Sequence, residues 1–168
     1  MIDPKDILAV AAQKKEENYA FRSYLKMHAD PDTLDRQFAR LHKDLFGRYD
    51  CCKCRNCCKM YCGYFHESDI GAAAVTLGIS EEELIKKYLQ RNNGIGYVTN
   101  NAPCDFLNGD GSCILGDAKP QDCKDFPFTD KPDRIGSLFG IVENADYCPV
   151  VFEMLEELKK EYGFKYKK

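Results

Sequence analysis

Apolar positions recur at helical spacing over the first fifty residues of the chain. Asp3 can cap a helix that has Pro4 at its first position, and helix-compatible residues continue to about His28. A second stretch places apolar side chains at intervals of four, three and four residues, on one helical face: Leu34, Phe38, Leu41 and Leu45. Gly47 suits the exit of this second helix.

Capping signals predict two further helices after the densest group of cysteines. Ser68 or Asp69 can begin a helix of small and apolar residues, which Gly78 would end. Ser80 and Glu83 then form a capping box, which is a typical start of the next helix.

The following segment has the pattern of a hairpin. Residues 104–115 hold short apolar runs around a glycine-rich turn, which predicts a β-hairpin that brings Cys104 and Cys113 close together. Pro120 can open a short helical turn that holds Cys123.

The rest of the pattern completes a small α+β fold. Residues 135–142 resemble one more strand, and Pro149 begins a last helix. We therefore predict a mainly helical, metal-stabilised cysteine-cluster domain with a short β-hairpin over residues 49–168. Residues 1–48, which contain no cysteine, are predicted to be a helical N-terminal extension.

Cysteine is the residue type that changes this picture. The chain has ten cysteines in 168 residues, and six of them lie between Cys51 and Cys62. Thiolate is a soft ligand for zinc or for an iron-sulfur cluster, and a two-residue gap lets one turn present two sulfurs to one centre. That gap occurs twice, once between Cys51 and Cys54 and once between Cys54 and Cys57.

The spacing leaves the number of metal centres open. The fourth ligand of the C-x2-C-x2-C run must come from elsewhere, and adjacent cysteines such as Cys57 and Cys58 rarely serve one metal together. Cys104, Cys113 and Cys123 form a second group, which Cys148 can complete. Two four-thiolate sites, or one site with several thiols outside it, both agree with these counts.

Composition and charge argue against binding to nucleic acid or membranes and favour a cytoplasmic location. The chain is 44% apolar and 30% charged, with a net charge of −3, so no basic surface for nucleic acid or for an acidic membrane is indicated. The N-terminus opens with acidic residues, and its apolar run is shorter than a signal-peptide core. We expect a cytoplasmic protein, in which closely spaced cysteines indicate metal or redox chemistry more than disulfides.

The cysteine run resembles the signature of the CxxCxxCC cysteine-cluster family, the YkgJ type, whose members are described as zinc- or iron-chelating. The likeness covers about residues 51–150 and departs from the usual pattern at Lys119, where arginine is common, and at Leu115, where tyrosine is common. Further segments carry the likeness: Ser68-Asp69-Ile70, Cys104-Asp105-Phe106-Leu107, Gly111-Ser112-Cys113-Ile114, and Phe126-Pro127-Phe128.

The resemblance implies which cysteines hold the metal. These are Cys51, Cys54, Cys57, Cys58, Cys104, Cys113 and Cys123, with Cys148 as a plausible eighth. A similar cysteine module in flagellin lysine methylases is associated with an iron-sulfur cluster, which favours iron over zinc. Methylase activity is not implied, because the chain has no glycine-rich nucleotide fingerprint.

Three functions follow from this sequence. The first is a protein that holds an iron-sulfur cluster, [4Fe-4S], for electron transfer, sensing or support of an unidentified protein partner. The second is a zinc-stabilised interaction module with one or two four-thiolate sites. The third is an enzyme with an open cluster position, for which the sequence shows no base, nucleophile or cofactor loop.

Overall fold

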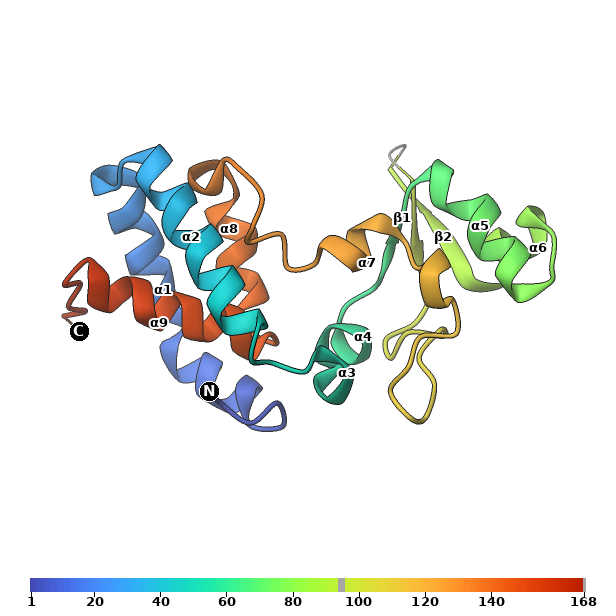
Figure 1. Ribbon diagram of the computed structural model, residues 1–168, viewed down its shortest axis with the longest axis horizontal. Coiled ribbons are helices and arrows are strands. Elements are labelled where there is room, and N and C mark those ends of the chain that lie inside the picture. The colour runs from blue at the N-terminus through green and yellow to red at the C-terminus, as the bar shows by residue number, and fades with distance from the viewer. Residues whose placement is uncertain (94–95, 168) are drawn as a thin grey trace. The chain divides into compact units, whose positions relative to one another are not determined.

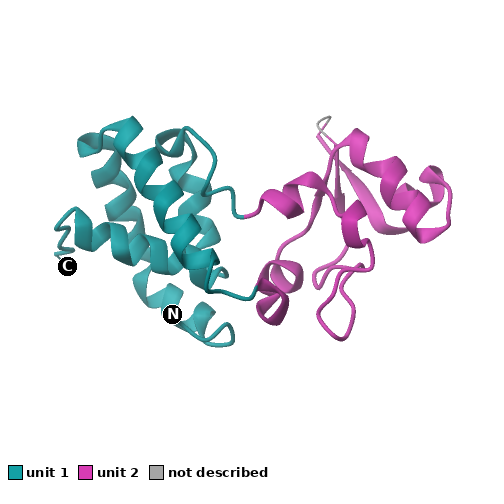
Figure 2. Cartoon of the chain, viewed as in Figure 1, with its two compact units in different colours: residues 1–50, 127–168 teal, residues 51–126 magenta. Residues whose placement is uncertain are grey.

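The computed structural model describes residues 1–93 and 96–167 (Figure 1). The chain divides into two compact units, which Figure 2 distinguishes by colour. Unit 1 comprises residues 1–50 and 127–168, and unit 2 comprises residues 51–126. The structure is mainly helical with a small antiparallel sheet, which confirms the predicted α+β class.

Unit 1 joins the two ends of the chain in one helical core. The sequence predicts a division into residues 1–48 and 49–168. In the structure, residues 127–168 belong to the same compact unit as the N-terminal helices. Phe21, Phe38 and Met154 are fully buried in this core. The helices that enclose it are α1 (Ile7–His28), α2 (Pro31–Phe46), α8 (Arg134–Asn144) and α9 (Pro149–Glu161).

The first two helices follow the predicted signals closely. The Asp30 carboxylate accepts a hydrogen bond from the Thr33 backbone N–H at 2.9 Å, with Pro31 at the first helical position of α2. All four apolar positions predicted for this helix are buried: Leu34, Phe38, Leu41 and Leu45. Helix α1 begins at Ile7, three residues later than predicted, because the Asp3 carboxylate caps a preceding turn by accepting from the Lys5 N–H at 3.0 Å.

The strand predicted at residues 135–142 is wrong, because this segment is helix α8. The Asp133 carboxylate accepts from the Gly136 N–H at 3.1 Å and so caps the helix. Leu138, Ile141 and Val142 are buried and share one helical face. A short apolar run does not distinguish a strand from a buried helix by itself, and packing against α1, α2 and α9 decides for the helix.

A buried lysine connects α9 to α1 inside unit 1. Lys159 is 5% exposed, and its ammonium group donates to Asn18 Oδ1 at 2.6 Å and to Glu17 Oε1 at 2.9 Å. It also donates to Glu156 Oε1 at 2.6 Å, one turn earlier on its own helix. Asn18 is itself buried, so loss of the lysine leaves a buried carbonyl oxygen without this donor.

We predict that Lys159→Met lowers the free energy of unfolding by about 1–3 kcal/mol, the cost of an unsatisfied buried polar group. Lys160→Met is the matched control, since Lys160 pairs with Glu157 at the surface and such pairs are worth about 0–1 kcal/mol. Urea unfolding followed by far-ultraviolet circular dichroism measures both. Equal losses in the two variants would contradict the assignment of this network to the core.

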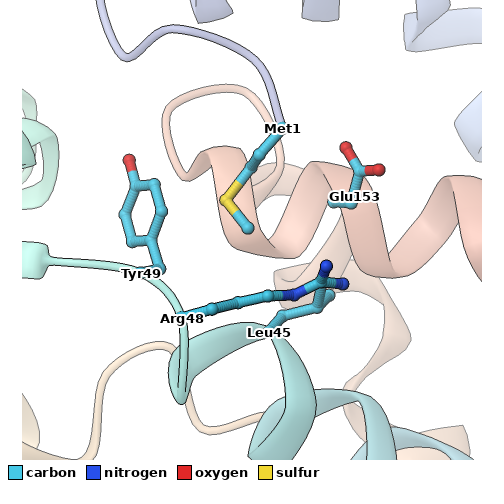
Figure 3. Close-up of a pocket in the computed structure, with 5 residues that line it drawn as sticks. All are labelled: Met1, Leu45, Arg48, Tyr49 and Glu153. Carbon is cyan, nitrogen blue, oxygen red and sulfur yellow. The ribbon is translucent and has the colours of Figure 1, made fainter.

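A pocket of about 200 Å³ also lies in unit 1 (Figure 3). Arg48, just after α2, and Glu153 of α9 contribute charged groups to its walls. Met1 and Leu45 contribute apolar groups. Its lining consists of Met1, Leu45, Arg48, Tyr49 and Glu153. Because no cysteine lines it, this pocket is separate from the thiol chemistry.

Unit 2 surrounds a small sheet with short helices. The strand order is β1-β3-β2, and both pairings are antiparallel, with Tyr64 opposite Val98 and Gln90 opposite Val98 on the other side. Its core includes Phe65, Leu84 and Phe106. The elements in chain order are α3 (Cys51–Cys54), α4 (Asn56–Met60), β1 (Tyr64–Phe65), α5 (Glu67–Leu77), α6 (Glu81–Tyr88), β2 (Leu89–Asn92), β3 (Gly96–Thr99), the 3-10 helix η1 (Gly116–Ala118) and α7 (Gln121–Asp125).

Helix starts in unit 2 agree with the sequence in part. Ser80 caps α6 and accepts from the Glu83 N–H at 3.1 Å, as predicted. Helix α5 begins after His66, so the predicted caps Ser68 and Asp69 lie inside its first turn. Asp69 still serves this end of the helix, since its carboxylate accepts from the His66 N–H at 2.9 Å.

The predicted hairpin at residues 104–115 is a turn with a single bridge between Leu107 and Cys113, and the hairpin of this fold is β2 with β3. In the described ranges, 1–93 and 96–167, no helix combines the length and the apolar character that crossing a membrane requires.

Candidate metal centre

The first cysteines lie on two very short helices, α3 and α4, that meet at Arg55. This residue adopts a left-handed conformation with φ of 53°, which costs about 1–3 kcal/mol outside glycine and persists only where neighbours hold it. Its N–H donates to the Cys51 carbonyl at 3.1 Å, and its own carbonyl accepts from the Lys59 N–H at 3.0 Å. The sharp turn lets Cys54, which is 7% exposed, lie in the interior while the thiols of α4 stay half-buried.

Cys57 and Cys58 present neighbouring sulfurs from α4. Their Sγ atoms lie 4.0 Å apart and share a hydrogen bond. This bond is the largest influence on Cys58 and, with the positive charges of Arg55 and Lys119, it lowers the pKa of the Cys58 thiol to about 6. Cys58 is therefore the sulfur in this turn that is best prepared to be a thiolate, the form that binds metal.

The turn at residues 104–116 approaches the same helices through its backbone. The Cys104 N–H donates to the Cys58 carbonyl at 2.8 Å, which holds the first residue of the turn beside α4. Gly111, with φ of +86°, lies where an added Cβ would be 2.9 Å from the Cys52 carbonyl oxygen. Only glycine allows this approach, and the bridge from Leu107 to Cys113 then holds the other side of the turn.

Helix α7 brings Cys123 to the same region. Its sulfur lies against Gly63, because a Cβ added at that glycine would be 3.3 Å from Cys123 Sγ. At the end of α7 the ring of Phe126 lies 6.1 Å from that of Tyr61, measured between centroids. The segment just before β1 and the segment that carries Cys123 thus pack on each other.

Electrostatic coupling shows which sulfurs lie near one another. The pKa of the Cys104 thiol is raised to about 11, mainly by burial of its sulfur and in smaller part by the charges of Cys58 and Cys113. Burial likewise raises the pKa of Cys123 to about 12, although part of this residue is exposed, with further contributions from Cys104, Cys58 and Cys113. These four thiols therefore belong to one neighbourhood of unit 2.

The remaining predicted ligands have other positions. Cys51 is exposed on α3, while Cys148 is buried in unit 1, just before α9, and so lies outside the cysteine-rich unit. Of the two cysteines predicted to lie outside the site, Cys52 is exposed and Cys62 is half-buried. All ten cysteines are thiols in the described chain, and the ligand set stays a prediction.

The donor set of unit 2 fits a thiophilic metal in its chemistry. Throughout the part of the chain that the structure describes, no three histidine, cysteine, aspartate or glutamate side chains surround one point closely enough to hold a single ion. The clustered thiols nevertheless offer soft sulfur donors, and a cation would lower their pKa values by stabilising the thiolate form, which burial now disfavours.

Sequence reasoning overlooked two basic residues at this cluster. Arg55 and Lys119 both act on the Cys58 thiol, and Arg55 also forms a hydrogen bond with it. Their position was visible in the sequence, since Arg55 lies within the cysteine run and Lys119 occupies a motif position where arginine is usual. Positive charge between cysteines is the signal that would have identified them.

Comparison with known families identifies the family to which this cysteine cluster belongs. Residues 50–149 match the family model CxxCxxCC, described as "Putative zinc- or iron-chelating domain". The chain belongs to the CxxCxxCC family. Membership supports metal binding by the cysteine cluster, with zinc or iron as the metal. The chain matches none of the curated proteins and none of the solved structures with which it was compared.

We predict that the metal-free CxxCxxCC protein shows unequal thiol reactivity. Iodoacetamide reacts with thiolate, so its reaction with Cys58 should rise through a pH of about 6, because the pKa of this thiol is lowered. Cys104 and Cys123, whose pKa values are raised to about 11 and about 12, should stay unreactive up to about pH 8. Peptide mass spectrometry over a pH series measures each site. A common midpoint near the ordinary value of about 8.5 would contradict the arrangement.

Proposed function

We propose that this chain holds a [4Fe-4S] iron-sulfur cluster on the thiols of unit 2. The observation that carries the proposal is the neighbourhood formed by Cys58, Cys104, Cys113 and Cys123, whose sulfurs influence one another electrostatically without surrounding one ion. A four-iron cluster is wider than a single metal ion and is held by four separate thiolates. Four neighbouring thiols on separate segments supply the number of ligands that such a cluster needs.

The proposed ligands come from segments that the fold already joins. Cys58 is tied to Cys104 by a backbone hydrogen bond of 2.8 Å, and Cys123 lies against Gly63. Arg55 and Lys119 would compensate part of the negative charge of the thiolates. Because four thiolates complete one cluster, we assign the other cysteines of the family motif, Cys51, Cys54 and Cys57, to a second metal centre. When bound, a [4Fe-4S] cluster supplies one-electron redox chemistry.

A zinc-stabilised module is the second candidate, and one distance favours it. Zinc-sulfur bonds of about 2.3 Å in a tetrahedron place the ligand sulfurs about 3.8 Å apart. The Sγ atoms of Cys57 and Cys58 are 4.0 Å apart, close to that value. In this alternative the metal contributes folding free energy and undergoes no reaction.

The biological role that we propose is electron transfer, sensing or support of an unidentified protein partner in the cytoplasm. Three short helices and one bridged turn carry the cysteines of unit 2 other than Cys62. Such segments gain order from a bound metal, which suits a protein whose state reports on metal or oxidant.

Metal and acid-labile sulfide content of protein purified without oxygen tests the choice of metal. We expect iron with matching sulfide and a broad absorption near about 400 nm that dithionite bleaches. Zinc at one or two atoms per chain, without colour and stable in air, would contradict the cluster and establish the zinc module.

Serine substitutions test which cysteines bind the metal. We predict that Cys54→Ser and Cys123→Ser each lose most of the bound metal and much of the solubility, because a ligand and its share of the folding free energy are removed. Cys52→Ser is the matched control, since the exposed Cys52 lies outside the proposed set. Metal analysis of the three variants gives the answer. Full metal content in Cys54→Ser would show that the ligand set is misassigned.

A further inference from the structure

Helix α7, which carries Cys123, is too short to hold its own position. It spans Gln121–Asp125, and helices of this length are unstable without outside contacts. Its local backbone bonds are few, with the Lys124 N–H donating to the Pro120 carbonyl at 3.1 Å and the Phe126 N–H to the Asp122 carbonyl at 2.9 Å. The position of the Cys123 sulfur therefore depends on its contact with Gly63 and on what holds the start of α7.

One carboxylate joins the start of α7 to the start of α5. Asp69 Oδ2 accepts from the His66 N–H at 2.9 Å, and Asp69 Oδ1 accepts from the Gln121 N–H at 3.3 Å. Both N–H groups lie at helix N-termini, where a helix leaves backbone donors without intrahelical acceptors and where negative charge is favoured. A single side chain thus satisfies donors from two elements that are 52 residues apart in sequence.

A second bond lies directly beside the first. His66 Nε2 is 3.1 Å from Asp122 Oδ1, so the residue before α5 also contacts the residue before Cys123. This pair is partly exposed, so by itself it adds little stability. Together with the Asp69 bonds it forms what we call the α5–α7 joint, consisting of His66, Asp69, Gln121 and Asp122.

Helix α5 is a firm support for this joint. It has eleven residues, and Ile70, Ala73 and Ala74 bury one of its faces in the core of unit 2. The joint therefore connects a weakly held ligand segment to a well-packed helix. None of its members is a sulfur ligand in the proposed site.

We propose that Asp69 is a positioning residue for the metal centre, which holds α7 so that Cys123 meets the other thiols, with His66 as its accessory. The proposal rests on the proposed function, because it requires Cys123 to be a metal ligand. It assigns a role at the metal site to a carboxylate that does not touch the metal.

Hydrogen exchange of the metal-free protein tests the joint itself. Asp69→Asn keeps the size of the side chain but has one carbonyl oxygen in place of two. We expect the remaining oxygen to keep the shorter bond to the His66 N–H, so that the 3.3 Å bond to the Gln121 N–H is the one lost. We expect amides of residues 121–125 to exchange about fivefold faster, the effect of losing one hydrogen bond. Glu67→Gln is the matched control. It removes a carboxylate from the same first turn of α5, and that carboxylate pairs with Arg91 at the surface. Unchanged exchange in Asp69→Asn would overturn the proposal.

Cluster reconstitution then tests the link to Cys123. The metal-free protein is supplied with iron and sulfide without oxygen, and the iron and sulfide retained per chain are measured with the absorption near about 400 nm. Cys123→Ser should lower all three, because a cluster ligand is removed. Asp69→Asn should cause the same loss, and the double variant no more than either single one. Native cluster content in Asp69→Asn beside reduced content in Cys123→Ser would overturn the positioning role alone. Native content in Cys123→Ser, or no cluster in the native chain, would overturn the proposed site and this inference with it.

A second pair of variants keeps the test decisive if Asp69→Asn does not fold by circular dichroism. His66→Ala removes the bond to Asp122, whereas His66→Gln can restore it with its amide nitrogen. We expect reduced cluster absorption near about 400 nm in the first and recovery in the second. The same spectrum in both, whether native or reduced, would overturn the proposal.

Discussion

Repulsion between neighbouring thiolates is the constraint on which the cysteine-rich unit depends. Two thiolates 4 Å apart, at an effective dielectric constant of about 20, repel each other by about 4 kcal/mol. That energy corresponds to about three pKa units, so the adjacent Cys57 and Cys58 do not both ionise near neutral pH without a cation. Burial adds to the effect at Cys104 and Cys123. A metal that converts these thiols to ligands would therefore also stabilise the fold around them.

The fold of unit 2 meets this constraint with short segments on a firm support. The proposed ligands lie on α3, α4, α7 and one bridged turn, and Phe106 anchors that turn in the core, where Phe65 of β1 and Leu84 of α6 also lie. Backbone hydrogen bonds connect the ligand segments, as between Cys104 and Cys58, and Asp69 connects α7 to α5. Arg55 supplies positive charge within the cysteine run itself. Local flexibility is thus confined to the parts that a metal would order.

The sequence predicted those elements whose signals are local. Helix α2 was found from its regular apolar face, and helix α6 from its Ser80 cap, whereas the Asp30 cap of α2 was not used. Helix α8 was missed because its apolar run fits a strand equally well, and only tertiary packing decides. The cysteine motif identified the family and the ligand candidates. It could not reveal Asp69, whose role depends on a hydrogen bond to a residue 52 positions away, nor the place of Cys148 in unit 1.

Differential alkylation of the protein purified without oxygen tests the central claim, that one metal centre gathers thiols from both halves of unit 2. The protein is labelled before and after removal of its metal by a chelator, and each cysteine is quantified by peptide mass spectrometry. The labelling is done at about pH 10, where thiols with raised pKa values still react slowly when no metal holds them. The account predicts that Cys58, Cys104, Cys113 and Cys123 are protected together by the metal and become more reactive together when it is removed, while the exposed Cys52 reacts equally in both states. Equal labelling of Cys104, Cys113 and Cys123 with and without metal at this pH would contradict it.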